Sequence, residues 1–103
     1  MTPGPTSGPS SVRTELQRVV ERWRQLPLDH ALACLPPVRD LVQRLADGVA
    51  DAEGRPRSMV PDLGPGVVMD QLTVVVFDAG RSAAVGPARV AAQLARLRHT
   101  LTN

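Results

Sequence analysis

The chain has 103 residues, 12 arginines, no lysine and a formal net charge of only +2. This length holds one small domain, and a hydrophobic content of 43% is ordinary for a protein with a packed core. A single cysteine, Cys34, excludes an intramolecular disulfide framework and indicates a reducing compartment. Isoleucine and tyrosine are also absent and asparagine occurs once, which indicates a GC-rich, actinobacterial genome rather than selection for phosphate binding.

Residues 1–9 are rich in proline and glycine and have too little apolar surface to offset the entropy of ordering, so we expect a disordered tail. The tail lacks the cations and the apolar run of a secretory signal. No stretch approaches the roughly 20 apolar residues that a membrane span needs. We therefore expect a cytoplasmic protein with a single helical domain over 10–103 and no membrane partner.

The first helix is predicted from a serine N-cap at Ser10 or Ser11 to Gln25, where Pro27 ends it. Residues 28–35 are predicted as a short helix or two turns, which Pro36-Pro37 breaks. A long helix then follows over 37–52, because proline suits the first turn, and Gly54 is placed to end it. In each long helix the apolar residues recur at steps that favour one buried face: Val12, Leu16, Val19, Val20, Trp23 and Leu26 in the first, and Val38, Leu41, Val42, Leu45 and Val49 in the second.

Residues 54–66 are predicted as a loop, from which Met59, Val60 and Leu63 pack back onto the core. The stretch 67–79 is ambiguous, because its β-branched residues favour a strand at 72–77 while its apolar residues recur at helical steps. Nothing else in the chain offers a partner strand, so a helix is predicted, and its apolar character marks it as the most buried one.

The last helix begins at Pro87, after a loop over 81–86, and its apolar residues also recur at helical steps: Val90, Leu94, Leu97 and Leu101. The predicted fold is all-α, a small four-helix bundle whose helices lean antiparallel. An α+β fold is the alternative if residues 72–77 form a strand.

Charge is unevenly distributed, because the chain is basic at its ends and acidic in its middle, and no acidic residue follows Arg81. The simplest use of this pattern is internal: the last helix lies beside the acidic helix 37–52. The same pattern suits a basic surface for an acidic partner. Four residues of the last helix are the candidate partner-binding site: Arg89, Gln93, Arg96 and Arg98.

No catalytic, cofactor or metal site is predicted. His30 and Cys34 share a helix face, but zinc requires three or four protein ligands. The turn Gly64-Pro65-Gly66 lacks the preceding strand and the lysine of a phosphate-binding loop. Asp70 and Asp78 lie about 12 Å apart along a helix, too far for a pair of acid–base catalysts.

Residues 84–91 resemble the turn and second helix of a helix–hairpin–helix motif, in which a Gly-x-Gly-Pro turn offers backbone N–H groups to DNA phosphate. Here Ala84 stands at the first glycine and the preceding Leu-Pro pattern is missing, so no family membership follows. The sequence therefore predicts a small, non-catalytic protein–protein interaction module, either an adaptor, a regulator or a self-associating subunit. The alternative is a nucleic-acid-binding protein that uses the basic C-terminal helix.

Overall fold

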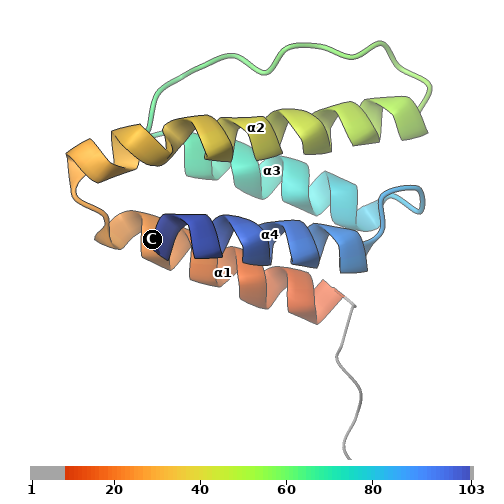
Figure 1. Cartoon of the computed structure of the whole chain (residues 1–103). Coiled ribbons are helices and arrows are strands. Elements are labelled where there is room, and N and C mark those ends of the chain that lie inside the picture. The colour runs from red at the N-terminus through yellow and green to blue at the C-terminus, as the bar shows by residue number, and fades with distance from the viewer. Residues whose placement is uncertain (1–8, 103) are drawn as a thin grey trace, which may run out of the picture.

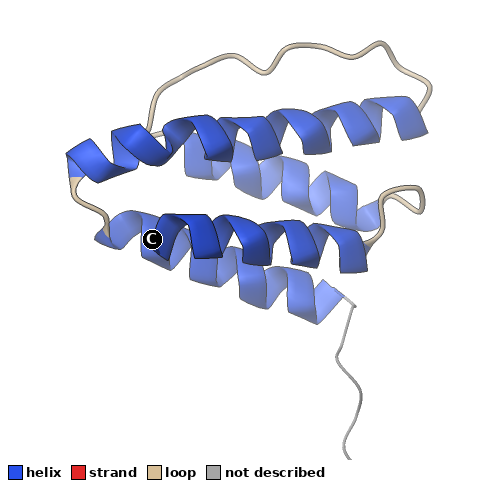
Figure 2. Cartoon of the chain, viewed as in Figure 1, coloured by secondary structure: helices blue, strands red, loops and turns tan. Residues whose placement is uncertain are grey.

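A computed structural model describes residues 9–102, which form four α-helices and no strand. They are α1 (Pro9–Gln25), α2 (Leu28–Ala52), α3 (Val68–Arg81) and α4 (Pro87–Thr102) (Figure 2). The predicted all-α four-helix bundle is confirmed, and residues 72–77 are helix rather than strand. Residues 1–8 of the predicted tail lie outside the described residues, and α1 begins at Pro9, one residue before the expected serine cap.

The prediction that Pro36 and Pro37 separate two helices is wrong, because α2 runs through both. Proline cannot donate the backbone hydrogen bond to the carbonyl four residues earlier, so Leu32 and Ala33 lose their helical partners. Both residues are exposed, which lets water satisfy those carbonyls. The apolar face also continues across the proline pair, since Ala31 and Cys34 are buried in register with the later core residues of α2. Burial of this first segment offsets the cost of the prolines.

The C-terminus of α2 ends as predicted at Gly54, whose φ of 68° lies in the left-handed region that glycine adopts without strain. The Arg55 N–H donates to the Ala50 carbonyl at 2.8 Å, and the Gly54 N–H donates to the Asp51 carbonyl at 3.2 Å. These two bonds form a Schellman motif. The chain therefore reverses at this point and does not continue away from α2.

Residues 53–67 run back alongside most of α2, but not its first turns, before α3 begins (Figure 1). Gln43 holds this segment: its Nε2 donates to the Ser58 carbonyl at 3.0 Å and its Oε1 accepts from the Val60 N–H at 2.8 Å. Val60 packs against the core as expected. Met59 and Leu63 do not, because they are 84% and 57% exposed.

This return path makes α2 and α3 parallel, whereas the helices joined by short loops, α1 to α2 and α3 to α4, are antiparallel as predicted (Figure 1). The most extensive packing lies within two parallel pairs, α1 with α4 and α2 with α3. All four helices contribute to one core, in which Trp23 is only 9% exposed. The predicted position of α3 as the most buried helix is wrong, because Val74 and Phe77 lie on its exposed side.

Candidate functional site

The four predicted partner-binding residues do not share one surface. Arg98 lies on the α1 side of α4, where its Nε contacts Glu15 Oε2 at 3.1 Å, and Glu15 also pairs with Arg18. Gln93 and Arg96 lie on the α2 side. Arg89 is exposed, two helical turns before Arg96, and outside the groove that Arg96 lines. The structure therefore brings together Gln93 and Arg96 and separates Arg98 from them.

A groove between α2 and α4 contains Gln93 and Arg96. Pro37, Leu41 and Arg44 contribute the α2 wall, and Gln93, Arg96, Leu97 and Thr100 contribute the α4 wall. Its apolar floor is formed by Leu41 and Leu97, which are both buried. Among residues 9–102, none that lines the groove is acidic. We call this the α2–α4 groove.

The arginines on both walls of the α2–α4 groove are free of ion pairs within residues 9–102. Arg44 Nε donates only to the Asp40 backbone carbonyl at 3.3 Å, and Arg96 has no carboxylate within ion-pair distance. Gln93 Oε1 is buried and has no hydrogen-bond donor among the described residues. A buried acceptor without a donor costs about 1–3 kcal/mol, so the α4 wall of the groove carries a local destabilising feature.

The expectation that the last helix is neutralised by the acidic helix 37–52 is wrong. Of the three arginines in α4, only Arg98 forms an ion pair among the described residues, and its partner belongs to α1. Asp51 of α2 instead contacts Arg57, in the segment that follows the helix, at 2.7 Å, and Glu53, the first residue of that segment, contacts Arg55. Arg57 donates hydrogen bonds to the Asp51 carboxylate and so lowers the pKa of Asp51.

Charge is consequently divided between the two parallel pairs. The α1–α4 pair carries seven arginines against two glutamates, a formal charge of +5. The α2–α3 pair with residues 53–67 carries five arginines against eight acids, a formal charge of −3. Together these values give the net +2 of the chain.

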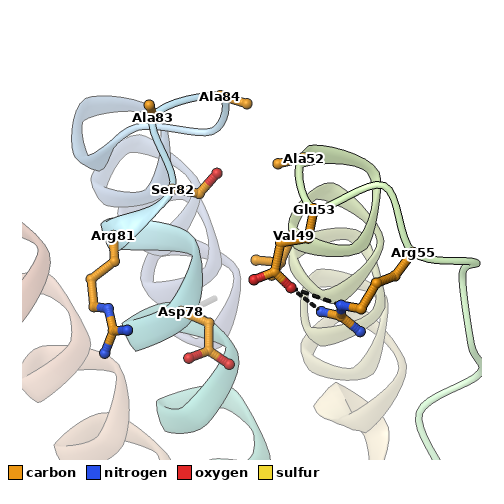
Figure 3. Close-up of a pocket in the computed structure, with 9 residues that line it drawn as sticks. All are labelled: Val49, Ala52, Glu53, Arg55, Asp78, Arg81, Ser82, Ala83 and Ala84. Atoms are coloured by element: carbon orange, nitrogen blue, oxygen red, sulfur yellow. Dashed lines mark hydrogen bonds and ion pairs between the residues drawn. The ribbon is translucent and has the colours of Figure 1, made fainter.

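A larger hollow, of about 520 Å³, lies elsewhere, between the C-terminal ends of α2 and α3 and the loop after α3 (Figure 3). Asp78 faces Glu53 across it, Glu53 is bound to Arg55, and Arg81 points away on the other side of α3. Val49 is the only buried residue of this lining. The hollow is therefore an open, solvent-filled depression between helix ends rather than an enclosed site.

The other residues weighed from the sequence do not gather into a site. Cys34 is buried in the core, and His30 beside it is not joined by further ligands. Across residues 9–102, no three histidine, cysteine, aspartate or glutamate side chains lie close enough to hold a metal ion. The Gly86 N–H, in the stretch that resembles a helix–hairpin–helix turn, donates to the Ser82 carbonyl at 2.9 Å. It is therefore engaged within the loop.

Comparison with known proteins assigns no family to this geometry. No protein-family model, no curated protein and no solved structure matches the chain. None of the four described helices is at once long and apolar enough to cross a bilayer. The α2–α4 groove is the surface at which the sequence prediction and the structure overlap.

Proposed function

We propose that this chain is a protein-interaction module whose α2–α4 groove binds an acidic, amphipathic segment of another protein. The observation that supports this function is the placement of Arg44 and Arg96 on opposite walls of a groove with an apolar floor and no acid. An acidic segment would place an apolar side chain between Leu41 and Leu97 and carboxylates against the two guanidinium groups. Arginine is suited to this role because its planar fork binds a carboxylate through two hydrogen bonds.

The size of the groove favours a macromolecular partner over a small molecule. Its volume is about 110 Å³. Pockets that bind drug-sized ligands and cofactors have volumes of about 300–1,000 Å³ and bury most of the ligand surface. The α2–α4 groove has room for one side chain of a partner, which is how helix-in-groove complexes place each anchor residue.

The chemistry of the groove favours a protein over a nucleic acid. Proteins that bind single-stranded nucleic acid stack bases on aromatic side chains. Trp23 is buried in the core and Phe77 lies on α3, so neither is at the groove. The groove therefore offers cations for carboxylates and an apolar floor for an aliphatic side chain, and none of its lining residues has an aromatic face on which a base could stack.

A direct test uses a labelled synthetic peptide with leucines at helical spacing flanked by glutamates, and measures its binding by fluorescence anisotropy. Replacing both groove arginines, Arg44→Glu with Arg96→Glu, should raise the Kd by about a hundredfold, because two charge-assisted contacts of roughly 1.5 kcal/mol each become repulsive or are lost. Far-UV circular dichroism should show unchanged helicity, because exposed arginines contribute little to stability.

The matched control is Arg55→Glu with Arg57→Glu, which gives the same net charge but alters the segment after α2. This control should change the Kd by less than about threefold, since screening weakens charges beyond about 10 Å. Equal loss in both variants would mean that net charge, not the groove, governs binding, and would overturn the proposal. Tighter binding of duplex DNA than of the peptide, with a steep salt dependence lost in the groove variant, would establish the nucleic-acid alternative.

A further inference from the structure

The exposed side of α3 carries an apolar pair that no other described part of the chain covers. Val74 is 60% exposed and Phe77 is 63% exposed. Asp70 and Arg81 extend the same line, since the steps of four, three and four residues keep all four side chains on one helical face. We call this line, Asp70, Val74, Phe77 and Arg81, the α3 stripe.

The two ends of the α3 stripe carry opposite charges that are not neutralised within residues 9–102. Neither Asp70 nor Arg81 forms an ion pair there. The Arg81 guanidinium lies over the Phe77 ring, 5.3 Å from its centroid, which keeps its aliphatic stem against the apolar pair. The stripe thus has an apolar centre, an acidic end toward the N-terminus of α3 and a basic end toward its C-terminus.

This arrangement is self-complementary when two copies of α3 pack antiparallel. A twofold axis that passes between positions 75 and 76 places Val74 opposite the partner's Phe77 and Asp70 opposite the partner's Arg81. The same axis repeats both contacts in reverse, as an isologous interface requires. We propose that the chain self-associates through the α3 stripe, with a second copy of this chain as the partner.

A hollow next to the stripe has room for an apolar side chain of that second copy. A depression of about 210 Å³ lies between α1 and α3 beside Phe77, and Val12 and Leu16 line its α1 wall. Gly80 leaves its α3 wall open, because no atom lies within 4 Å of the place where a Cβ would be. Apolar side chains of the partner's stripe have a space to fill without repacking of the core.

A foreign helix with a single sign of charge fits the stripe less well than a second copy does. An acidic helix would meet Asp70, and a basic helix would meet Arg81. Only a partner with the same sequence of charges, reversed in direction, pairs both ends at once. The surface is small, and stable interfaces bury about 800 Å² on each partner, so we expect a weak dimer that forms at high concentration. This surface is distinct from the α2–α4 groove, and the two proposals fail independently.

A charge-swap series on the full chain tests the inference by sedimentation velocity over a range of concentrations. Asp70→Arg and Arg81→Asp, each made alone, should weaken dimerisation by about tenfold, because each creates like-charge contacts at two symmetric positions. The double variant should return the dimer affinity to within about threefold of the natural chain, because the exchanged charges pair again. Phe77→Ser should abolish the dimer, whereas Met59→Ser, an exposed apolar position off the stripe, should not.

Each outcome bears on the proposal. A natural chain that stays monomeric at every concentration would overturn it, as would a dimer that survives Phe77→Ser. Single variants that weaken the dimer without rescue in the double variant would overturn the antiparallel register. Circular dichroism of each variant checks that its helices are intact. The Phe77→Ser chain should still bind the acidic peptide, which separates this surface from the α2–α4 groove.

Discussion

The α1–α4 pair and the α2–α3 pair use the same cation in opposite ways. In the α2–α3 pair, three of the five arginines contact neighbouring acids: Arg39 contacts Asp62 at 3.6 Å, and Arg55 and Arg57 contact Glu53 and Asp51. In the α1–α4 pair, arginines outnumber acids by seven to two, so most of them have no carboxylate to bind. Arginine side chains therefore hold the segment after α2 through ion pairs, whereas in the α1–α4 pair most of them form an exposed basic surface.

The two pairs also differ in what holds their helices together. Both pairs pack directly, but α2 and α3 follow each other in the chain, so they are parallel only because residues 53–67 return along α2. Polar contacts from Gln43 fix that return path. The α2–α3 pair therefore depends on the route of a loop in addition to hydrophobic packing.

The largest expected effect tests whether the two pairs share one core. Val76 in α3 is 2% exposed, and Val76→Asp should unfold all four helices, because an unpaired buried charge costs several kcal/mol, comparable with the whole stability of a small domain. Val74→Asp, two residues earlier on the exposed side, should leave the fold intact. Urea unfolding followed by circular dichroism measures both. If Val76→Asp unfolds α3 alone, the pairs are separate folding units.

A smaller change, this time a gain in stability, tests whether α2 is one continuous helix. Pro36 is exposed within α2, and Pro36→Ala should raise the free energy of unfolding by about 1–3 kcal/mol, because it restores a helical N–H donor. Pro36 is the better choice than Pro37, which lines the α2–α4 groove. A decrease in stability would show that the proline pair shapes a bend on which the bundle depends.

The chain reversal at Gly54 predicts a loss of stability of similar size when this glycine is replaced. Gly54→Ala should lower the free energy of unfolding by about 1–2 kcal/mol, since an L-residue is strained at its positive φ. Gly66→Ala, in open space and without a positive φ, should have little effect. If thermal melting shows equal losses in both variants, the left-handed turn at Gly54 is not what the α2–α3 pair requires.

The smallest expected effect is the pH dependence of the contact between Asp51 and Arg57. The pKa of Asp51 is lowered by its hydrogen bonds from Arg57, so this contact is complete above the ordinary aspartate pKa of about 3.9 and is lost as pH falls through the lowered value. Backbone amide NMR shifts of Arg55, Arg57 and Ser58 should change in that range, while those of buried Leu94 in α4 should not follow them. Asp51→Asn should remove the transition, and its persistence would assign it to another carboxylate.

Local patterns predicted most of the fold. The apolar periodicity identified the core faces of all four helices, and Gly54 and Pro87 marked a helix end and a helix start. The predicted helix break at Pro36-Pro37 was wrong because the cost of the prolines is visible in the local sequence. The burial of Ala31 and Cys34 that offsets this cost depends on tertiary packing. The path of residues 53–67 depends on Gln43, an ordinary polar residue in the sequence whose role appears only when the chain returns to it.

The candidate site was predicted in part. Gln93 and Arg96 were identified because the last helix has no acid to neutralise its arginines. Arg98 was grouped with them, but a step of two residues along a helix turns a side chain by about 200°, and it faces α1. Arg44 was missed because nothing local in the sequence shows that α2 and α4 face each other there.

The central claim, that the arginines of the α2–α4 groove are available for binding while those after α2 are engaged, can be measured residue by residue. Nitrogen-15 NMR of the arginine Nε–H groups during titration with the acidic peptide reports each guanidinium separately. We predict that the signals of Arg44 and Arg96 shift together to saturation while those of Arg55 and Arg57 stay in place. A uniform shift of all arginine signals, or a shift confined to Arg55 and Arg57, would contradict the account.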